Sequence, residues 1–290
     1  MRFRTRISNV ALLHKIVRSL AALAKVCVVR LSPDSVHFIV PGNEGRDGVQ
    51  VWSQVKPTLF DHFRIESNNN NEIWLEVNLD ALLKAGIANG GRGGNTTLSD
   101  ADVMVKLNKL DGRPVWTFEI SGRTPQGNPI TITHNVTVHI ISSRRQKELT
   151  EPLCPPPDIH LVLPNLSELK TIVSRLGHLA EDVTLAANHN GQLDLRVKAN
   201  GVQMSTTWNN LRIPTTADAE DTDPHPPEQM FSTTISIRGF QKFLTSHYVS
   251  GVAIACICEG HCVIAYVYIG GEIDEAGGVL TFFLPAKNVD

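Results

Sequence analysis

A proline-rich stretch near the middle of the chain is the strongest constraint on its fold. Residues 141–164 read ISSRRQKELTEPLCPPPDIHLVLP, with Pro152 and Pro155 to Pro157 before Asp158. Proline fixes φ and lacks an amide donor, so these prolines cannot occupy a helix interior or a central strand. The stretch therefore predicts an extended, semi-rigid connector.

The segments on either side of this connector share one plan, which indicates an internal duplication. Each begins with a short strand and an amphipathic helix, continues with several strands and a second helix, and ends in further strands. A chain of 290 residues is long for one hydrophobic core and sufficient for two. We therefore predict an α+β fold of two similar domains, residues 1–140 and 159–290, joined by a connector at residues 141–158.

Four segments have the apolar spacing of amphipathic helices, namely residues 10–24, 79–88, 165–178 and 238–247. In three of them we assign Lys, Arg and His, and no Asp or Glu, to the side opposite the apolar one, and the second contributes Lys84. The chain has 27 Lys and Arg against 29 Asp and Glu, a net charge of −2. These helices therefore carry positive charge on one side, although the chain as a whole is slightly acidic. The first strand, residues 2–7, also alternates, with Arg2, Arg4 and Arg6 on one face.

A basic face on a single helix is also what an ordinary solvated helix shows. Repetition of such faces in a duplicated unit favours a functional surface, and it suits the DNA backbone, which carries about one negative charge per 1.7 Å of axis. We predict that one continuous surface facing duplex DNA contains Lys15, Arg18, Lys25, Lys84, Arg92, Lys170, Arg175, Arg238 and Lys242.

Three stretches resemble the Hus-type subunit of the checkpoint sliding clamp, the nine-one-one complex. They are residues 1–39, with MRFRTRI at the start and LAKVCVVRLSPDSVHFI at 23–39; EPLCPPPDI at 151–159, followed by Leu163 and Pro164; and FFLPA at 282–286. The similarity runs over almost the whole length and is looser between these stretches. It implies the DNA-clamp fold, in which each domain has two helices lining an inner face and antiparallel sheets outside.

The same resemblance implies a non-enzymatic subunit of a heterotrimeric ring, assembled with two related clamp subunits and placed on DNA by a clamp loader. The ring would encircle duplex DNA without sequence preference and serve as a docking platform for repair and checkpoint proteins. The expected location is the nucleus, with a cytoplasmic pool possible. A self-associating replication processivity clamp is the alternative within the same fold.

A clamp ring closes when edge strands of neighbouring subunits pair, and two segments are candidates for these edges. Residues 130–140 and 202–208 alternate and contain no proline or lysine. A proline at Thr133 or at Met204 is expected to break one interface each, provided that the replaced amide faces the partner. The competing interpretation is that loops of the same chain cover both edges. The expected interface residues are Ile130, Ile132, Thr133, Val136 and Val138, with Val202, Met204, Thr206 and Trp208.

Clamps of this class also bind partner peptides in an apolar groove beside the connector. By resemblance we place this groove near Val40, Leu149, Leu153 and Pro285. The alternative is that Leu149 and Leu153 only hold the connector against the sheet.

Motifs for catalysis or cofactors are weak. Cys256 and Cys258, followed by His261 and Cys262, are zinc ligands in principle, which makes a Cys/His metal-dependent enzyme the alternative from another class. Alternation instead puts Cys256 and Cys258 on one strand face as buried small hydrophobes. The five cysteines fit reduced thiols inside the cell, and no apolar run approaches the roughly 18 residues of a membrane span. We therefore predict no catalytic set, no cofactor and no metal.

Overall fold

The computed structural model describes residues 1–42, 47–56, 59–87, 99–199, 201–214, 226–270 and 277–287. The chain divides into two compact units. The first comprises residues 1–41, 52–150 and 277–279, and the second comprises residues 42–51, 151–276 and 280–290. The boundary after residue 150 falls inside the expected connector, and the segment 42–51 is grouped with the second half of the chain.

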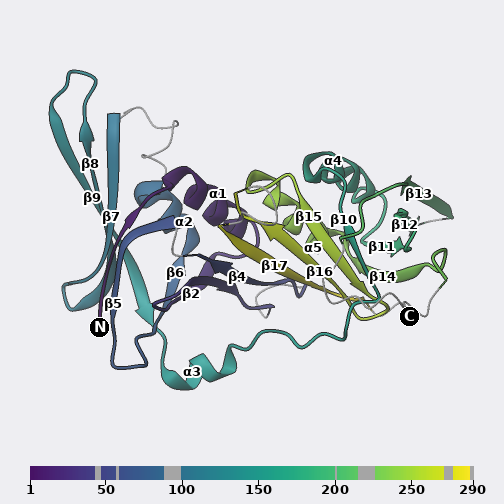
Figure 1. Cartoon of the computed structure of the whole chain (residues 1–290), viewed down its shortest axis with the longest axis horizontal. Coiled ribbons are helices and arrows are strands. Elements are labelled where there is room, and N and C mark those ends of the chain that lie inside the picture. The colour runs from purple at the N-terminus through teal and green to yellow at the C-terminus, as the bar shows by residue number, and fades with distance from the viewer. Residues whose placement is uncertain are drawn as a thin grey trace. The chain divides into compact units, whose positions relative to one another are not determined.

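The first unit contains one sheet, whose strands follow the order β4-β3-β2-β6-β9-β8-β7-β1-β5, together with α1 and α2 (Figure 1). The strands are β1 (Arg2–Ile7), β2 (Val26–Leu31), β3 (Val36–Val40), β4 (Gln50–Val55), β5 (Phe60–Glu66), β6 (Ile73–Asn78), β7 (Ser99–Leu110), β8 (Arg113–Arg123) and β9 (Pro129–Ile140). The helices are α1 (Val10–Ala21), α2 (Leu79–Leu82) with the π-helical turn η3 (Leu83–Ile87), and α3 (Ser143–Glu148).

The helix α1 forms where the apolar spacing predicts it. Its N-terminus is capped by Asn9, whose side chain accepts a hydrogen bond of 2.9 Å from the Leu12 amide. Its apolar side is fully buried through Ile16, Val17 and Leu20. The polar side is thereby turned away from the core.

The second helix differs from the predicted single helix over 79–88. One α-helical turn, α2, is capped by Asn78, whose side chain accepts a 2.9 Å bond from the Ala81 amide, and a π-helical turn follows. Gly86 lies in that turn. Glycine costs a helix about 1 kcal/mol relative to alanine, which favours the departure from α-helical geometry.

The second unit contains two sheets with the orders β10-β15-β16-β17 and β13-β12-β11-β14. The strands are β10 (Ile159–Val162), β11 (Asp182–Ala187), β12 (Leu193–Ala199), β13 (Val202–Trp208), β14 (Phe231–Ser236), β15 (Ala253–Cys258), β16 (Cys262–Tyr268) and β17 (Gly278–Pro285). The helices are α4 (Leu166–Leu176), α5 (Ile237–Phe243) and the 3₁₀ turn η4 (Leu244–Tyr248). Each unit therefore repeats the predicted order of strand, helix, strands, helix and strands.

Both helices of the second unit are also capped and half-buried. The Asn165 side chain accepts a 3.0 Å bond from the Ser167 amide at the start of α4, and the Ser236 hydroxyl accepts a 3.3 Å bond from the Gly239 amide at the start of α5. Phe243 of α5 packs edge-on against Phe282 of β17, with ring centroids 5.1 Å apart. These contacts bury the apolar sides of the helices and leave their basic residues on the other side. The exposed Glu168 in the first turn of α4 lies there as well, which corrects the expectation that this side of the helix has no acidic residue.

The first part of the connector is helical, which corrects the expectation of an extended chain from residue 141 onward. Ser142 caps α3, and Arg145 pairs with Glu148 at 3.0 Å one turn later. No proline precedes Pro152 in this stretch, so a short helix meets no steric obstacle there. From residue 149 to the start of β10 the chain forms neither helix nor strand, as its prolines require.

Candidate functional site

The basic side of α1 is open to solvent. Lys15 and Arg18 are exposed on it, Lys25 is exposed just beyond its end, and Lys84 is exposed on the turn η3. Burial, followed by the neighbouring charge of Arg18, lowers the pKa of His14, so His14 adds no positive charge at neutral pH. The predicted Arg92 lies outside the described residues. All the described DNA-facing candidates of the first unit are therefore accessible cations.

In the second unit, two of the four candidates are engaged within the chain. Arg175 and Arg238 are exposed. The Lys170 ammonium lies 5.4 Å from the ring centroid of Tyr248, a cation–π contact. The Lys242 ammonium lies 3.1 Å from a carboxylate oxygen of Asp47. The expectation that Lys242 simply points outward is thus incomplete.

Asp47 is the functional neighbour that sequence reasoning missed. Its carboxylate accepts a 3.0 Å hydrogen bond from the Ser236 hydroxyl in addition to the contact with Lys242, and its side chain is 12% exposed. Burial alone would raise the pKa of Asp47, but the hydrogen bonds from Lys242 and Ser236 outweigh burial and lower it. A charged Asp47 therefore holds Lys242 in place. The two residues are far apart in the sequence, and no motif links them.

Among the described residues β13 is the last strand of its sheet, in agreement with its prediction as an edge strand. Val202 and Met204 are 57% and 42% exposed, although Val197, which Met204 faces across the pair with β12, is buried. Side chains on this face of the sheet are thus buried on β12 and exposed on the neighbouring strand β13. Such an edge is a template for pairing with another chain.

The hydrogen-bond pattern fixes which amides of β13 face outward. The Asn188 amide donates to the Gln192 carbonyl. The backbone amides of even-numbered residues of β12 therefore point toward β11, and those of odd-numbered residues point toward β13. Because Val197 pairs with Met204, the Met204 amide faces β12. The outward amides belong to Gln203, Ser205 and Thr207. A proline at Met204 would therefore damage its own sheet, and Ser205 is the correct position for a test of the edge.

The strand β9 is only partly an edge, which corrects the prediction for residues 130–140. Its last residues pair with β6, with Val138 opposite Val77, while residues 129–137 pair with β8. Val138 is fully buried, so it cannot face another subunit, and Val136 is 3% exposed. Ile130, Ile132 and Thr133 lie on the stretch for which β8 is the only partner strand among the described residues.

The amide of Thr133 points away from β8. The Thr124 amide donates to the Asn128 carbonyl at the start of the pairing between β8 and β9. The backbone amides of even-numbered residues of β9 therefore point toward β8. On the other side, the Ile141 amide donates to the Trp74 carbonyl, in register with β6. The amides of odd-numbered residues of β9 therefore point to the open side of the strand. A proline at Thr133 removes one of these outward amides.

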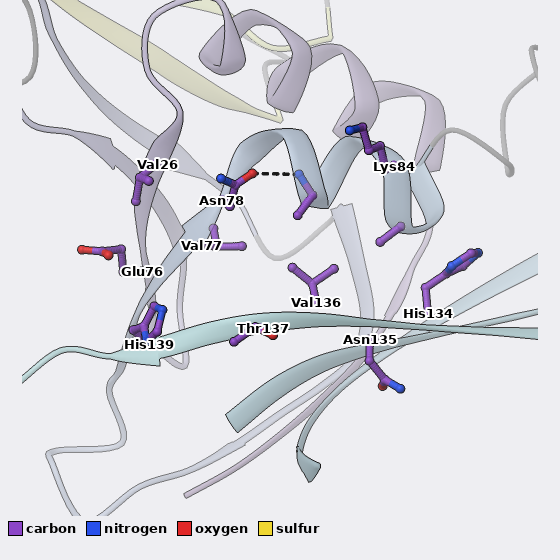
Figure 2. Close-up of a pocket in the computed structure, with 12 residues that line it drawn as sticks. Val26, Glu76, Val77, Asn78, Lys84, His134, Asn135, Val136, Thr137 and His139 are labelled. Atoms are coloured by element: carbon purple, nitrogen blue, oxygen red, sulfur yellow. Dashed lines mark hydrogen bonds between the residues drawn. The ribbon is translucent and has the colours of Figure 1, made fainter. Parts of the chain in front are cut away.

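A pocket of about 610 Å³ lies against this open side of β9, and Figure 2 shows it between α2 with η3 and the strand. Lys84 and His134 stand at one end of it, and Glu76 and His139 stand at the other. Small and apolar side chains also line it, including Ala81 and Val136. The edge and the pocket together form a surface with apolar and charged parts that a second protein chain can cover.

The residues predicted for a docking groove fall in different surroundings. Val40 and Leu149 are buried in the first unit, whereas Leu153 is 97% exposed and Pro285 is exposed in the second. Leu149 packs in a cluster with Val28, Ile39, Trp74 and Ile141. The groove itself stays a prediction. The alternative, that both leucines hold the connector, is wrong for Leu153.

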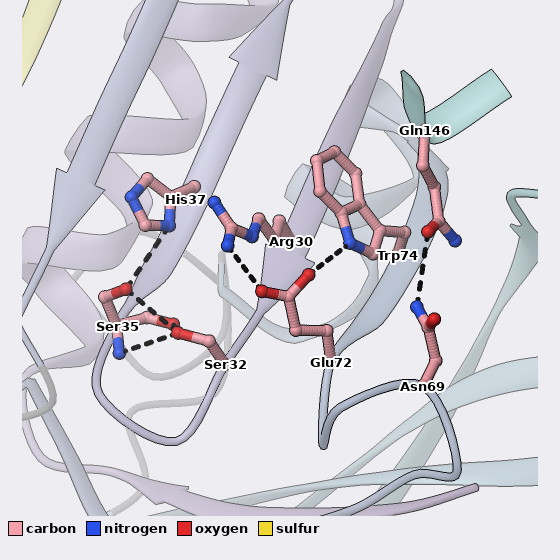
Figure 3. Close-up of polar contacts among 8 residues, drawn as sticks. All are labelled: Arg30, Ser32, Ser35, His37, Asn69, Glu72, Trp74 and Gln146. Carbon is pink, nitrogen blue, oxygen red and sulfur yellow. Dashed lines mark hydrogen bonds and ion pairs between the residues drawn. The ribbon is translucent and has the colours of Figure 1, made fainter. Parts of the chain in front are cut away.

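Polar contacts surround the Leu149 cluster on the first unit, and Figure 3 shows those that join Gln146 to Asn69 and Glu72 to Trp74 and Arg30. Gln146 of α3 donates to the Ile141 carbonyl at 2.9 Å and accepts a 3.2 Å bond from the Asn69 amide group. The Trp74 indole donates to Glu72 at 2.9 Å, and Glu72 also pairs with Arg30. These contacts fix α3 and the start of the connector against the sheet.

The two leucines of the connector should therefore differ in their effect on stability. We expect Leu149→Ala to lower the free energy of unfolding by about 2–4 kcal/mol, because it leaves a cavity in a packed cluster. Leu153→Ala should change it by less than about 0.5 kcal/mol, since nothing in the described chain covers that side chain. Urea unfolding followed by tryptophan fluorescence measures both. Equal losses of stability from the two substitutions would contradict this assignment.

The cysteines resemble core residues rather than ligands. Cys256, Cys258 and Cys262 are buried, and burial raises the pKa of Cys256 to about 12. His160 contacts the Cys256 sulfur at 3.1 Å. Within the described ranges, no group of three or more His, Cys, Asp and Glu side chains is placed to hold a metal ion.

No helix in the part of the chain that the structure covers has the length and apolar character needed to cross a membrane.

Comparisons with known proteins identify a family, two relatives and a solved structure that resemble this chain. The family model described as Hus1-like protein matches residues 1–288. Checkpoint protein hus1 of Schizosaccharomyces pombe is 32% identical over 294 residues, covering 98% of both chains, and Checkpoint protein HUS1 of Homo sapiens is 26% identical over 292 residues, covering 99% of both. The solved structure of Proliferating Cellular Nuclear Antigen from Entamoeba histolytica aligns with a TM-score of 0.70 at 16% identity, covering 98% of both chains. The predicted clamp fold is thereby confirmed.

Proposed function

The chain belongs to the Hus1-like family, and on that premise we propose that it is a subunit of a ring-shaped DNA clamp that acts in the DNA-damage checkpoint and in repair. The observation that carries the proposal is the family match over residues 1–288, together with relatives named checkpoint proteins that align from end to end. The resemblance predicted from the three sequence stretches is confirmed by this match.

In the proposed assembly the chain pairs with two related but different subunits, one at β9 and one at β13. Two features support this. Both strands offer backbone amides that no strand of the described chain uses, and β13 exposes Val202 and Met204 beside them. Backbone pairing is available to any sequence, so the choice of partner rests on side chains such as those of the pocket beside β9.

The proposed role toward DNA is passive and electrostatic. Exposed cations on α1, η3, α4 and α5 would contact phosphates of an encircled duplex and read no bases. A clamp loader would open the ring, and repair and checkpoint proteins would dock on it in the nucleus. The chain would carry out no catalysis itself.

Intact mass measurement of the complex that co-purifies with the chain from cells tests this proposal. We expect one copy of the chain with one copy each of two related subunits. A ring made of several copies of this chain alone would instead identify a self-associating replication clamp. Purified chain by itself should be monomeric or weakly associated at micromolar concentration, which sedimentation measures.

A further inference from the structure

A row of cations crosses one face of the first unit and plays no part in the clamp role described above. Arg4 of β1 pairs in register with Arg64 of β5 on one side and with Lys106 of β7 on the other. Side chains directly opposite one another on neighbouring strands lie about 5 Å apart at Cβ, and like charges placed this way are destabilising. The sheet therefore keeps two arginines and a lysine side by side at an electrostatic cost.

Most cations on this face have a carboxylate partner, and Arg4 and Arg64 have none among the described residues. Arg2 lies 3.8 Å from Glu66, Arg6 lies 2.5 Å from Asp102, and Lys106 lies 2.6 Å from Glu119.

The only polar contact of Arg4 in the described chain is a 3.0 Å bond from its Nε to the Met104 sulfur, a weak acceptor. Arg64 is exposed and has no hydrogen bond or ion pair to any described residue. The row therefore contains two adjacent guanidinium groups with unused donors.

We propose that Arg4 and Arg64 form a binding site for a single phosphate group on a protein partner, such as a phosphorylated serine or threonine. A guanidinium group binds phosphate through two parallel hydrogen bonds, and two such groups on neighbouring strands approach one dianion from two sides. The bound phosphate also removes the repulsion between the two arginines.

The surroundings of the pair favour an isolated phosphate over a nucleic acid. On β1 the next residues of this face lie two positions away, at about 6.7 Å, and their partners on β5 are Glu66, opposite Arg2, and Asp61, opposite Arg6. A second phosphate at that spacing would meet a carboxylate or a cation that already has a partner. A continuous polyanion is therefore disfavoured where one phosphate is accommodated.

The edge of the sheet at this point also argues for binding through side chains. β5 is the last strand in the sheet order, but its pairing with β1 is interrupted by a register shift between Arg4 and Arg6. His62 lies in this interruption with a φ of 51°. An irregular, charged edge resists the addition of another strand. A partner would therefore dock on the face of the sheet, where the two arginines point.

Titration of the full chain with a pentapeptide containing one phosphoserine tests the site. NMR signals of the arginine Nε–H groups serve as the readout. We expect the phosphopeptide to shift the signals of Arg4 and Arg64, and either Arg4→Gln or Arg64→Gln to weaken binding by about tenfold. Arg113→Gln, which changes another exposed arginine of the same unit, should leave the affinity unchanged.

Three results would overturn the proposal. The first is an equal response to the unphosphorylated peptide, which would remove the role of the phosphate. The second is tighter binding of a DNA duplex at the same arginines, which would identify a nucleic-acid surface. The third is a lower melting temperature of ligand-free Arg64→Gln at low salt. Relief of repulsion predicts a higher one, whereas a structural role of Arg64 predicts a decrease.

Discussion

Thr133→Pro and Ser205→Pro are each expected to remove one partner subunit, and a different one, while the chain stays folded. Both positions offer an amide that faces away from the neighbouring strand of the same sheet, so proline removes a hydrogen bond to the partner and none to a strand that the structure describes. Proline is tolerated on edge strands when the missing amide faces solvent. Pull-downs with the two partner subunits should show complete loss of one partner for each variant.

Met204→Pro and Ile132→Pro are the matched controls for this pair. Each lies one residue away on the same strand, but its amide faces β12 or β8, so the substitution breaks the sheet of the chain itself. We expect these two variants to lower the melting temperature clearly, and Thr133→Pro and Ser205→Pro to lower it little. The edge assignment fails when both outward variants lose the same partner, or when neither loses any.

The directions of these amides could not be predicted from the sequence, although the strands could. Alternation in residues 130–140 locates β9 correctly, because every second side chain is turned inward. The pairing of Val138 with Val77 depends on a strand about sixty residues earlier, and nothing in the local pattern of either strand indicates it. The difference between an edge and an inner strand is a property of such distant pairings.

The helices show the same division between local and distant causes. Capping by Asn9 and Asn165 and the apolar spacing after them are local, and both helices begin where these signals predict. The ion pair between Asp47 and Lys242 joins residues about two hundred positions apart, so the wheel of α5 alone shows Lys242 only as an outward cation. The helix α3 had a readable signal in its cap Ser142, which the prolines downstream obscured in the prediction.

Replacing the exposed helix cations with alanine should flatten the salt dependence of DNA binding by the assembled ring. The variant changes the candidates that lie exposed on the helices or beside them, which are Lys15, Arg18, Lys25, Lys84, Arg175 and Arg238. Each phosphate bound by a cation adds about 0.9 to the slope of log K against log salt concentration, so the slope should fall by about that amount for every such cation removed. Fluorescence anisotropy of a labelled duplex at several salt concentrations measures it.

The matched control separates contact with DNA from total charge. It changes six exposed cations elsewhere, which are Lys109, Arg113, Arg123, Arg144, Arg145 and Lys147, and it should leave the slope nearly unchanged.

Lys242→Ala provides a second comparison, because Lys242 is already paired with Asp47. This variant should barely alter the slope but should lower the free energy of unfolding by about 1–3 kcal/mol, since it leaves a mostly buried carboxylate without its cation. Retention of the full slope by the helix variant, or an equal decrease in the control, would mean that the helices do not face the duplex. The salt slopes of all these variants are measured on rings of confirmed composition, so a failure of assembly is not mistaken for weaker binding to DNA.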